Sequence, residues 1–176
     1  MRSAVIVIDM VNDFVNGVFG SEEAVKLAKK FPSFLEKIGD SAEIIFTLDT
    51  HISYDPEFKV WGEHCLTGTK ASEIVDELKD IEGYRIMKRH YDAFFDTDLD
   101  GYLRARGVNR IFLSGVSTDI CVLHTAAGAF FRHYDVSVIK DFCASIDPVK
   151  HDEAIAFIKR NYGSNIITSS ETLEVI

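Results

Sequence analysis

Short runs of apolar residues alternate with longer amphipathic stretches along most of this chain. The apolar runs are continuous and rich in β-branched residues, which is typical of strands buried on both faces. They predict six strands, at residues 4–8, 42–48, 84–87, 110–114, 136–139 and 165–168. The amphipathic stretches predict five helices, at residues 22–38, 71–78, 98–106, 118–132 and 148–160, with Ser21 and Thr97 as caps of the first and third.

Strands that alternate with helices favour a parallel sheet with helices on both faces. We therefore predict an α/β protein with a three-layer, doubly wound fold, a mainly parallel six-stranded sheet, and a single domain over residues 1–176. The segment between Asp49 and Lys70 has no clear periodicity. Long irregular loops in compact domains usually carry function, so this segment is of interest.

Composition narrows the classes of partner. The 176 residues are 47% hydrophobic and 27% charged, as in ordinary soluble proteins. The net charge of −9 argues against binding to nucleic acid or an anionic membrane surface. Three cysteines suggest a reducing compartment, and the apolar run at the start is interrupted by Asp9, which argues against a signal peptide. We expect a cytoplasmic protein that acts on a small molecule.

Reactive side chains follow four of the predicted strands. Asp9 follows the first strand, Asp49 and His51 follow the second, Lys88 follows the third, and Cys121 opens the helix after the fourth. Because ligand sites in doubly wound folds form outside the carboxyl ends of the strands, we expect these side chains at one edge of the sheet.

Cys121 is the candidate nucleophile. In the first turn of a helix, the helix dipole and the free backbone N–H groups stabilise a thiolate and can hold an oxyanion. The competing interpretation is a small buried core residue, the commoner role of a cysteine. Likewise Asp9 alone is compatible with a turn or helix cap, and Lys88 alone with a solvated strand end. Their coincidence favours catalysis.

A second group consists of Asp49, His51 and His64. One carboxylate and two imidazoles suit a divalent metal, first zinc, with iron or manganese as alternatives. The alternative is a set of polar surface residues in a loop. Other motifs fail: residues 96–101 resemble the start of a calcium loop, but the twelfth position is Gly107 instead of Glu.

At these residues the chain resembles a known family. Asp9, Lys88 and Cys121 are similar to the Asp-Lys-Cys triad of the isochorismatase-like cysteine hydrolases, and residues 115–122 (GVSTDICV) resemble the nucleophile motif of that family. The likeness extends over nearly the whole chain. Within the family, Asp49-Thr50-His51 and residues 61–65 (WGEHC) resemble the metal site of nicotinamidases.

The resemblance implies several further properties. It implies a non-proline cis peptide between Val116 and Ser117, which would aim backbone N–H groups of Ser117 and Cys121 at an oxyanion. It implies that Phe14 and Trp61 line a substrate ring and that the protein is a homo-oligomer. The implied activity is hydrolysis of a small amide, most specifically nicotinamide to nicotinate and ammonia.

Two kinds of alternative stay open at this point. One is another branch of the same family, such as an N-carbamoyl or ureido amide hydrolase, or isochorismatase, which cleaves a vinyl ether and needs no metal. The other is a catalytically silent binding or assembly module, against which an intact triad argues.

Overall fold

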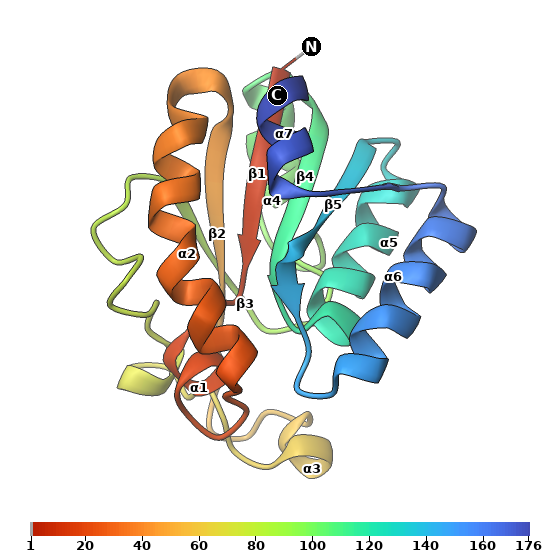
Figure 1. The fold of residues 1–176 in the computed structure, drawn as a ribbon. Coiled ribbons are helices and arrows are strands. Elements are labelled where there is room, and N and C mark those ends of the chain that lie inside the picture. The colour runs from red at the N-terminus through yellow and green to blue at the C-terminus, as the bar shows by residue number, and fades with distance from the viewer. Residues whose placement is uncertain (1) are drawn as a thin grey trace.

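The six strands of the protein form one sheet in the order β3-β2-β1-β4-β5-β6, in a computed structural model that describes residues 2–176 (Figure 1). Every pairing between neighbouring strands is parallel. The strands are β1 Arg2–Ile8, β2 Glu43–Asp49, β3 Tyr84–Lys88, β4 Val108–Val116, β5 Asp135–Ala144 and β6 Asn165–Ile167. The predicted doubly wound α/β fold is confirmed, and the sheet is wholly parallel.

Helices cover both faces of this sheet. Their bounds are α1 Asn12–Val15, α2 Glu22–Ile38, α3 Phe58–Trp61, α4 Leu99–Ala105, α5 Leu123–Phe131, α6 Pro148–Tyr162 and α7 Ser169–Val175. The core clusters show that α2 and α7 pack on one face, and α4, α5 and α6 on the other. No helix within residues 2–176 is long and apolar enough to cross a membrane.

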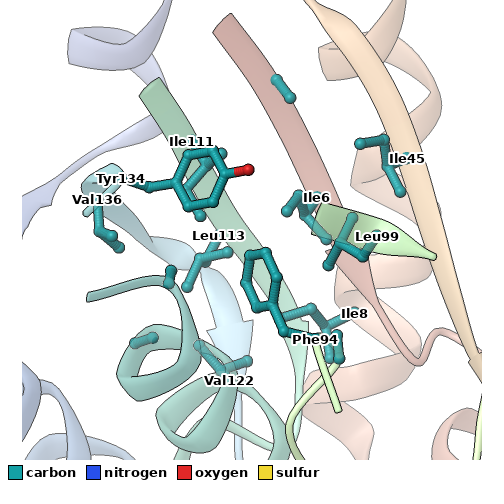
Figure 2. Packing of buried hydrophobic residues seen from close by; sticks show 14 of the residues in the cluster. Ile6, Ile8, Ile45, Phe94, Leu99, Ile111, Leu113, Val122, Tyr134 and Val136 are labelled. Atoms are coloured by element: carbon teal, nitrogen blue, oxygen red, sulfur yellow. The ribbon is translucent and has the colours of Figure 1, made fainter. Parts of the chain in front are cut away.

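Strand β1 explains why the apolar runs are continuous. Its side chains point alternately to the two faces. Ile6 and Ile8 belong to the cluster beneath α4 and α5, together with Leu113 (Figure 2), whereas Val5 and Val7 belong to the cluster beneath α2. Because both faces are covered, every position from Ala4 to Ile8 in β1 is apolar, and this stretch shows no alternation with polar residues.

Two of the predicted helices differ from the structure. Residues 71–78 form a 3₁₀ turn at Lys70–Ser72 followed by turns, because Val75 donates its backbone N–H to Met10 O at 3.0 Å and Ile74 pairs with Val11 as an isolated bridge. The predicted helix 118–132 begins with a π-helical turn at Thr118–Val122 before α5. The short helices α1, α3 and α7 lie in segments for which no helix was predicted.

The predicted caps are present in part. Ser21 caps α2 through its hydroxyl, which accepts a hydrogen bond from Ala24 N–H at 3.1 Å. The N-cap of α4 is Asp98 instead of Thr97, although the Thr97 hydroxyl still accepts from Leu99 N–H at 3.3 Å.

The parallel register brings the strand ends together at one edge of the sheet. Ile8, the last residue of β1, pairs with Thr47 on β2 and with Gly115 on β4, and Asp49 pairs with Lys88 on β3. The short helices α1 and α3 lie just beyond this edge, at the lower end of the view in Figure 1. Residues that follow these strands therefore share one site.

Candidate active site

Lys88 joins the groups that the sequence placed at this edge. Its Nζ lies 2.7 Å from Asp9 Oδ2, 3.0 Å from Asp49 Oδ1 and 3.6 Å from Cys121 Sγ. All four side chains are buried. Asp9 follows β1 in a left-handed conformation (φ 51°), and its Oδ1 accepts a hydrogen bond from the Thr47 hydroxyl at 2.7 Å. The triad residues thus form one buried cluster.

Burial and charge decide where the protons lie in this cluster. Burial raises the pKa of the Cys121 thiol well above its usual range, against the opposing effect of the Lys88 ammonium. Burial also raises the pKa of Asp9, although Lys88 opposes this shift too. Burial alone would lower the pKa of Lys88, but the carboxylates of Asp49 and Asp9 outweigh it and raise that pKa.

This result changes the expectation for Cys121. Its place in a helix start suggested a stabilised thiolate, but the residue lies in a π-helical turn, is 5% exposed, and has a raised thiol pKa. The resting group is therefore a thiol that needs a base to take its proton. Asp9, whose own pKa is raised by burial, is suited to that exchange.

Asp49, His51 and His64 form a second buried group beside the first. One ligand atom from each lies within 4.8 Å of the others. Asp49 Oδ2 lies 2.8 Å from His51 Nε2 and 3.7 Å from His64 Nε2. Burial raises the pKa of Asp49, but the Lys88 ammonium and His51 outweigh it, and the net shift is downward. Asp49 is thus held as a carboxylate between the two groups.

The orientation of both histidines fits a metal. His51 Nδ1 lies 3.1 Å from Asp55 Oδ2, and His64 Nδ1 lies 2.8 Å from Gly62 O. An imidazole whose Nδ1 faces an oxygen in this way presents its Nε2 to a metal, which is the usual arrangement around metal-bound histidine. One carboxylate oxygen and two imidazole nitrogens are donors that zinc, iron and manganese accept.

Burial would lower the pKa of His51, but Asp49 and Asp55 outweigh burial and raise that pKa to about 9. The carboxylates around the His51 ring thus favour a positive charge at this position. Either a proton on the ring or a bound metal ion would supply that charge.

Sequence reasoning missed two carboxylates in this region. Asp55 supports His51 and is itself held by Arg89, whose Nη2 lies 3.0 Å away. Glu57 Oε1 lies 3.7 Å from His64 Nε2 and offers a further oxygen donor to the metal group. The four-residue separation of His51 and Asp55 was a usable signal, whereas nothing in the sequence marked Glu57.

A pocket of about 220 Å³ opens onto Cys121. Phe14 and Trp61, for which the family resemblance implied contact with a substrate ring, line it together with Phe19 and His64. Trp61 is 43% exposed and donates its indole N–H to the Tyr91 hydroxyl at 2.8 Å. The floor and walls are mainly apolar and aromatic, so the pocket suits a small flat molecule.

The loop that precedes Cys121 forms one wall of this pocket. Val116, Ser117 and Asp119 line the pocket, and the peptide bond between Val116 and Ser117 is cis. Of the remaining cysteines, Cys65 and Cys143 are both buried and unpaired in the described chain. Burial raises the pKa of both thiols, as it does for Cys121. Neither thiol lines the pocket, so neither is placed to attack a molecule bound there.

Known proteins resemble this chain along almost its entire length. A family described as "Isochorismatase domain" matches residues 3–171. The N-carbamoylsarcosine amidase of Thermoplasma acidophilum is 37% identical, with a TM-score of 0.87 over 96% of this chain and 97% of that protein.

Two further solved structures have similar values. The pyrazinamidase/nicotinamidase of Streptococcus mutans is 34% identical, with a TM-score of 0.86 over 94% of this chain and 100% of the other. The pyrazinamidase of Pyrococcus horikoshii, solved in complex with zinc, is 29% identical, with a TM-score of 0.87 over 96% and 99% of the two chains. Together with the match over residues 3–171, these similarities show that the chain belongs to the isochorismatase family of hydrolases.

Proposed function

We propose that the protein hydrolyses the carboxamide of a small neutral aromatic ring, with nicotinamide as the best match. One observation carries the proposal: the Asp9–Lys88–Cys121 cluster and the Asp49–His51–His64 group meet through Lys88 and Asp49 beside a single aromatic pocket. The cluster supplies a nucleophile with its base, and the second group supplies a place for a metal next to the substrate.

The hydrolysis would proceed in two halves. Asp9 accepts the thiol proton of Cys121, and the Lys88 ammonium stabilises the resulting thiolate. The sulfur attacks the amide carbonyl carbon, and backbone N–H groups of Ser117 and Cys121 stabilise the oxyanion. The C–N bond then breaks, ammonia leaves with the proton from Asp9, and a thioester remains. A water molecule, deprotonated by Asp9, attacks the thioester and releases the acid and the thiol.

The residues that would hold a metal are Asp49, His51 and His64, with Glu57 in reach as a further donor. When bound, a divalent cation there would supply a Lewis-acidic contact for an electron pair of the substrate ring. The similarity to the zinc-bound Pyrococcus pyrazinamidase supports zinc as the first metal to test.

The charges around the pocket favour a neutral substrate over an anionic one. Glu57, Asp119 and Asp147 line it, and no lysine or arginine does within the described chain. Because carboxylates in a pocket of low polarity repel an anion, an N-carbamoyl amino acid should bind poorly. That class remains the second candidate, since the Thermoplasma N-carbamoylsarcosine amidase is 37% identical to this chain.

An ammonia-release assay on protein of measured metal content tests the proposal. The panel contains nicotinamide, pyrazinamide and N-carbamoylsarcosine, with Cys121→Ala as the inactive control and Cys143→Ala as the matched active control. We expect release from the first two amides, complete loss in Cys121→Ala, and an unchanged metal content in both variants. Faster release from N-carbamoylsarcosine would reverse the order of the candidates, and no release from any amide would contradict amide hydrolysis.

A further inference from the structure

Asp119 ties together the two strand ends that border the nucleophile. Its Oδ1 accepts a hydrogen bond from the Ser117 hydroxyl at 2.5 Å and another from the Ser145 hydroxyl at 2.7 Å. Its backbone N–H lies 3.3 Å from Ser145 Oγ, to which it donates. Ser117 directly follows β4 and Ser145 directly follows β5. The Asp119 network, defined here as Ser117, Asp119 and Ser145, therefore spans the exit of both strands.

The contacts of Asp119 indicate that its side chain fixes the positions of Ser117 and Ser145 relative to each other. Within residues 2–176 no cation lies within ion-pairing distance of its carboxylate, so it is not half of a salt bridge. Its side-chain hydrogen bonds are those of the two serine hydroxyls. Ser145 is 5% exposed at the end of a core strand and gives the network a rigid anchor. A carboxylate oxygen can accept hydrogen bonds from both serine hydroxyls at once, whereas an alanine at this position would accept neither.

We propose that Asp119 is a positioning residue that fixes the Ser117 peptide against the pocket, so that its N–H faces the oxyanion formed on attack by Cys121. The inference rests on the proposed function. Donors in an oxyanion hole must be held within fractions of an ångström of the position where charge develops, and small displacements lower the rate. Ser117 links β4 to the π-helical turn, and its carbonyl accepts the backbone N–H groups of Ile120 at 3.2 Å and Val122 at 3.1 Å. The Asp119 network adds a fixed position for its side chain.

The variants Ser117→Ala, Asp119→Ala and Asp119→Asn test this role through kcat and KM on the best amide of the panel. Asp119→Ala and Ser117→Ala should lower kcat tenfold to a hundredfold, below the roughly 10²- to 10³-fold loss caused by removing a donor outright. KM should change less than about threefold, because the lost support acts on the transition state. Asp119→Asn keeps an oxygen acceptor and should retain kcat within about threefold. Equal losses in Asp119→Asn and Asp119→Ala would overturn the proposal.

Two further measurements separate positioning from general damage. The double variant Ser117→Ala/Asp119→Ala should be no slower than the worse single variant, because both act on one peptide. Alkylation of Cys121 by iodoacetamide needs a thiolate but no oxyanion hole, and its rate should stay within about twofold of wild type. The matched control is Ser114→Ala on β4, the strand that leads to Ser117. It removes a buried hydroxyl that donates to Ile6 O on β1 at 3.1 Å, and it should keep kcat. Additive losses, or an equal fall in alkylation, would contradict the proposal.

A failure of the proposed substrate can be told apart from a failure of this role. If wild-type protein hydrolyses no amide of the panel, the proposed function has failed. The network is then tested with pyridine-3-carbaldehyde and benzaldehyde. The Cys121 sulfur adds to the aldehyde carbon, and the carbonyl oxygen takes the thiol proton, giving a hemithioacetal. The dissociation constant of that adduct should be at least tenfold higher in Asp119→Ala than in Asp119→Asn, and equal constants would overturn the proposal.

Discussion

The Lys88 ammonium is shared by two carboxylates, and it connects the nucleophile cluster to the metal group. Asp9 lies 2.7 Å and Asp49 lies 3.0 Å from its Nζ, and all three side chains are buried. Transfer of the Cys121 proton to Asp9 moves a negative charge from one neighbour of Lys88 to another without changing the total charge. Such a transfer requires little rearrangement of the surroundings, which is what an efficient nucleophile in a dry site needs.

We predict that Lys88→Met destabilises the protein and abolishes hydrolysis. It would remove the cation that Asp9 and Asp49 share, leaving Asp9 with only the Thr47 hydroxyl and Asp49 with His51. Breaking a buried ion pair costs about 3–5 kcal/mol of the free energy of unfolding. The measurement is urea denaturation followed by circular dichroism. The matched control is Lys150→Met, whose exposed pair with Glu153 should contribute less than about 1 kcal/mol. Equal stability of the two variants would contradict the role assigned to Lys88.

The raised pKa of Asp9 predicts the pH dependence of the reaction. Asp9 acts as a base only as a carboxylate, so kcat/KM should rise with pH as Asp9 loses its proton. Because burial raises the pKa of Asp9, this rise should be centred above the ordinary aspartate value of about 3.9. The measurement is a profile of kcat/KM against pH with the metal content checked at each point. A rate that stays constant down to about pH 4 at full metal content would contradict a base with a raised pKa at this position.

Among the structural elements, β4 approaches β1 so closely next to the site that only glycine fits. Gly115 has φ 110°, and a Cβ built on it would lie 2.1 Å from Ile8 O. We predict that Gly115→Ala lowers the free energy of unfolding by about 3 kcal/mol or more, through backbone strain and a clash between strands.

Gly101 provides the matched control for that variant. It lies inside α4, and a Cβ there would have no neighbour within 4 Å. Gly101→Ala should therefore stabilise the protein by about 0.5–1 kcal/mol, since alanine favours the helix. Thermal and urea unfolding of both variants should shift in opposite directions. A stable Gly115→Ala protein would show that the two strands can separate without cost.

The comparison of these elements shows what could be predicted from the sequence. Continuous β-branched runs such as Val5–Ile8, alternating with amphipathic stretches, are typical of strands buried on both faces, so the sheet and the strand ends with Asp9 and Lys88 could be predicted. The helix predicted at residues 71–78 was wrong, because this segment makes backbone contacts with residues 10 and 11. Local periodicity carries no information about such distant contacts. Glu57 was missed as a site residue because it contacts His64 within an irregular loop, and Asp119 because its partner Ser145 is distant in sequence.

Across the whole molecule, the parallel sheet determines that the chemistry lies at one edge. The loop 50–69 adds His51 and His64 to the metal group and Glu57, Trp61 and His64 to the pocket lining. This loop is tied back to the sheet edge and to α1. Thr50 donates its backbone N–H to Lys88 O on β3 at 2.8 Å, and Cys65 donates its backbone N–H to Asp13 Oδ2 on α1 at 2.8 Å. Within the loop, His51 N–H bonds to Cys65 O at 2.9 Å. His51 and His64 therefore approach Asp49 from two ends of one loop, and a metal between them would join the loop to β2.

This arrangement predicts that a bound metal stabilises the fold as well as the substrate complex. A ligand that binds only the native state at about 100 times its dissociation constant adds about 2.7 kcal/mol to the free energy of unfolding. At about 2–4 °C for each kcal/mol in a chain of this size, removal of zinc by a chelator should lower Tm by about 5–10 °C. Differential scanning calorimetry before and after chelation, with zinc added back, measures the effect.

The variant His51→Ala makes that measurement specific. It should bind no zinc at the site, and its Tm should be the same with and without chelator. His124→Ala, which changes an exposed histidine outside the metal group, should respond as wild type does. Because both variants remove one imidazole, a difference between them reports the site and not the loss of a histidine. An equal chelator response in both would mean that the metal binds elsewhere, and the assignment of Asp49, His51 and His64 as ligands would be wrong.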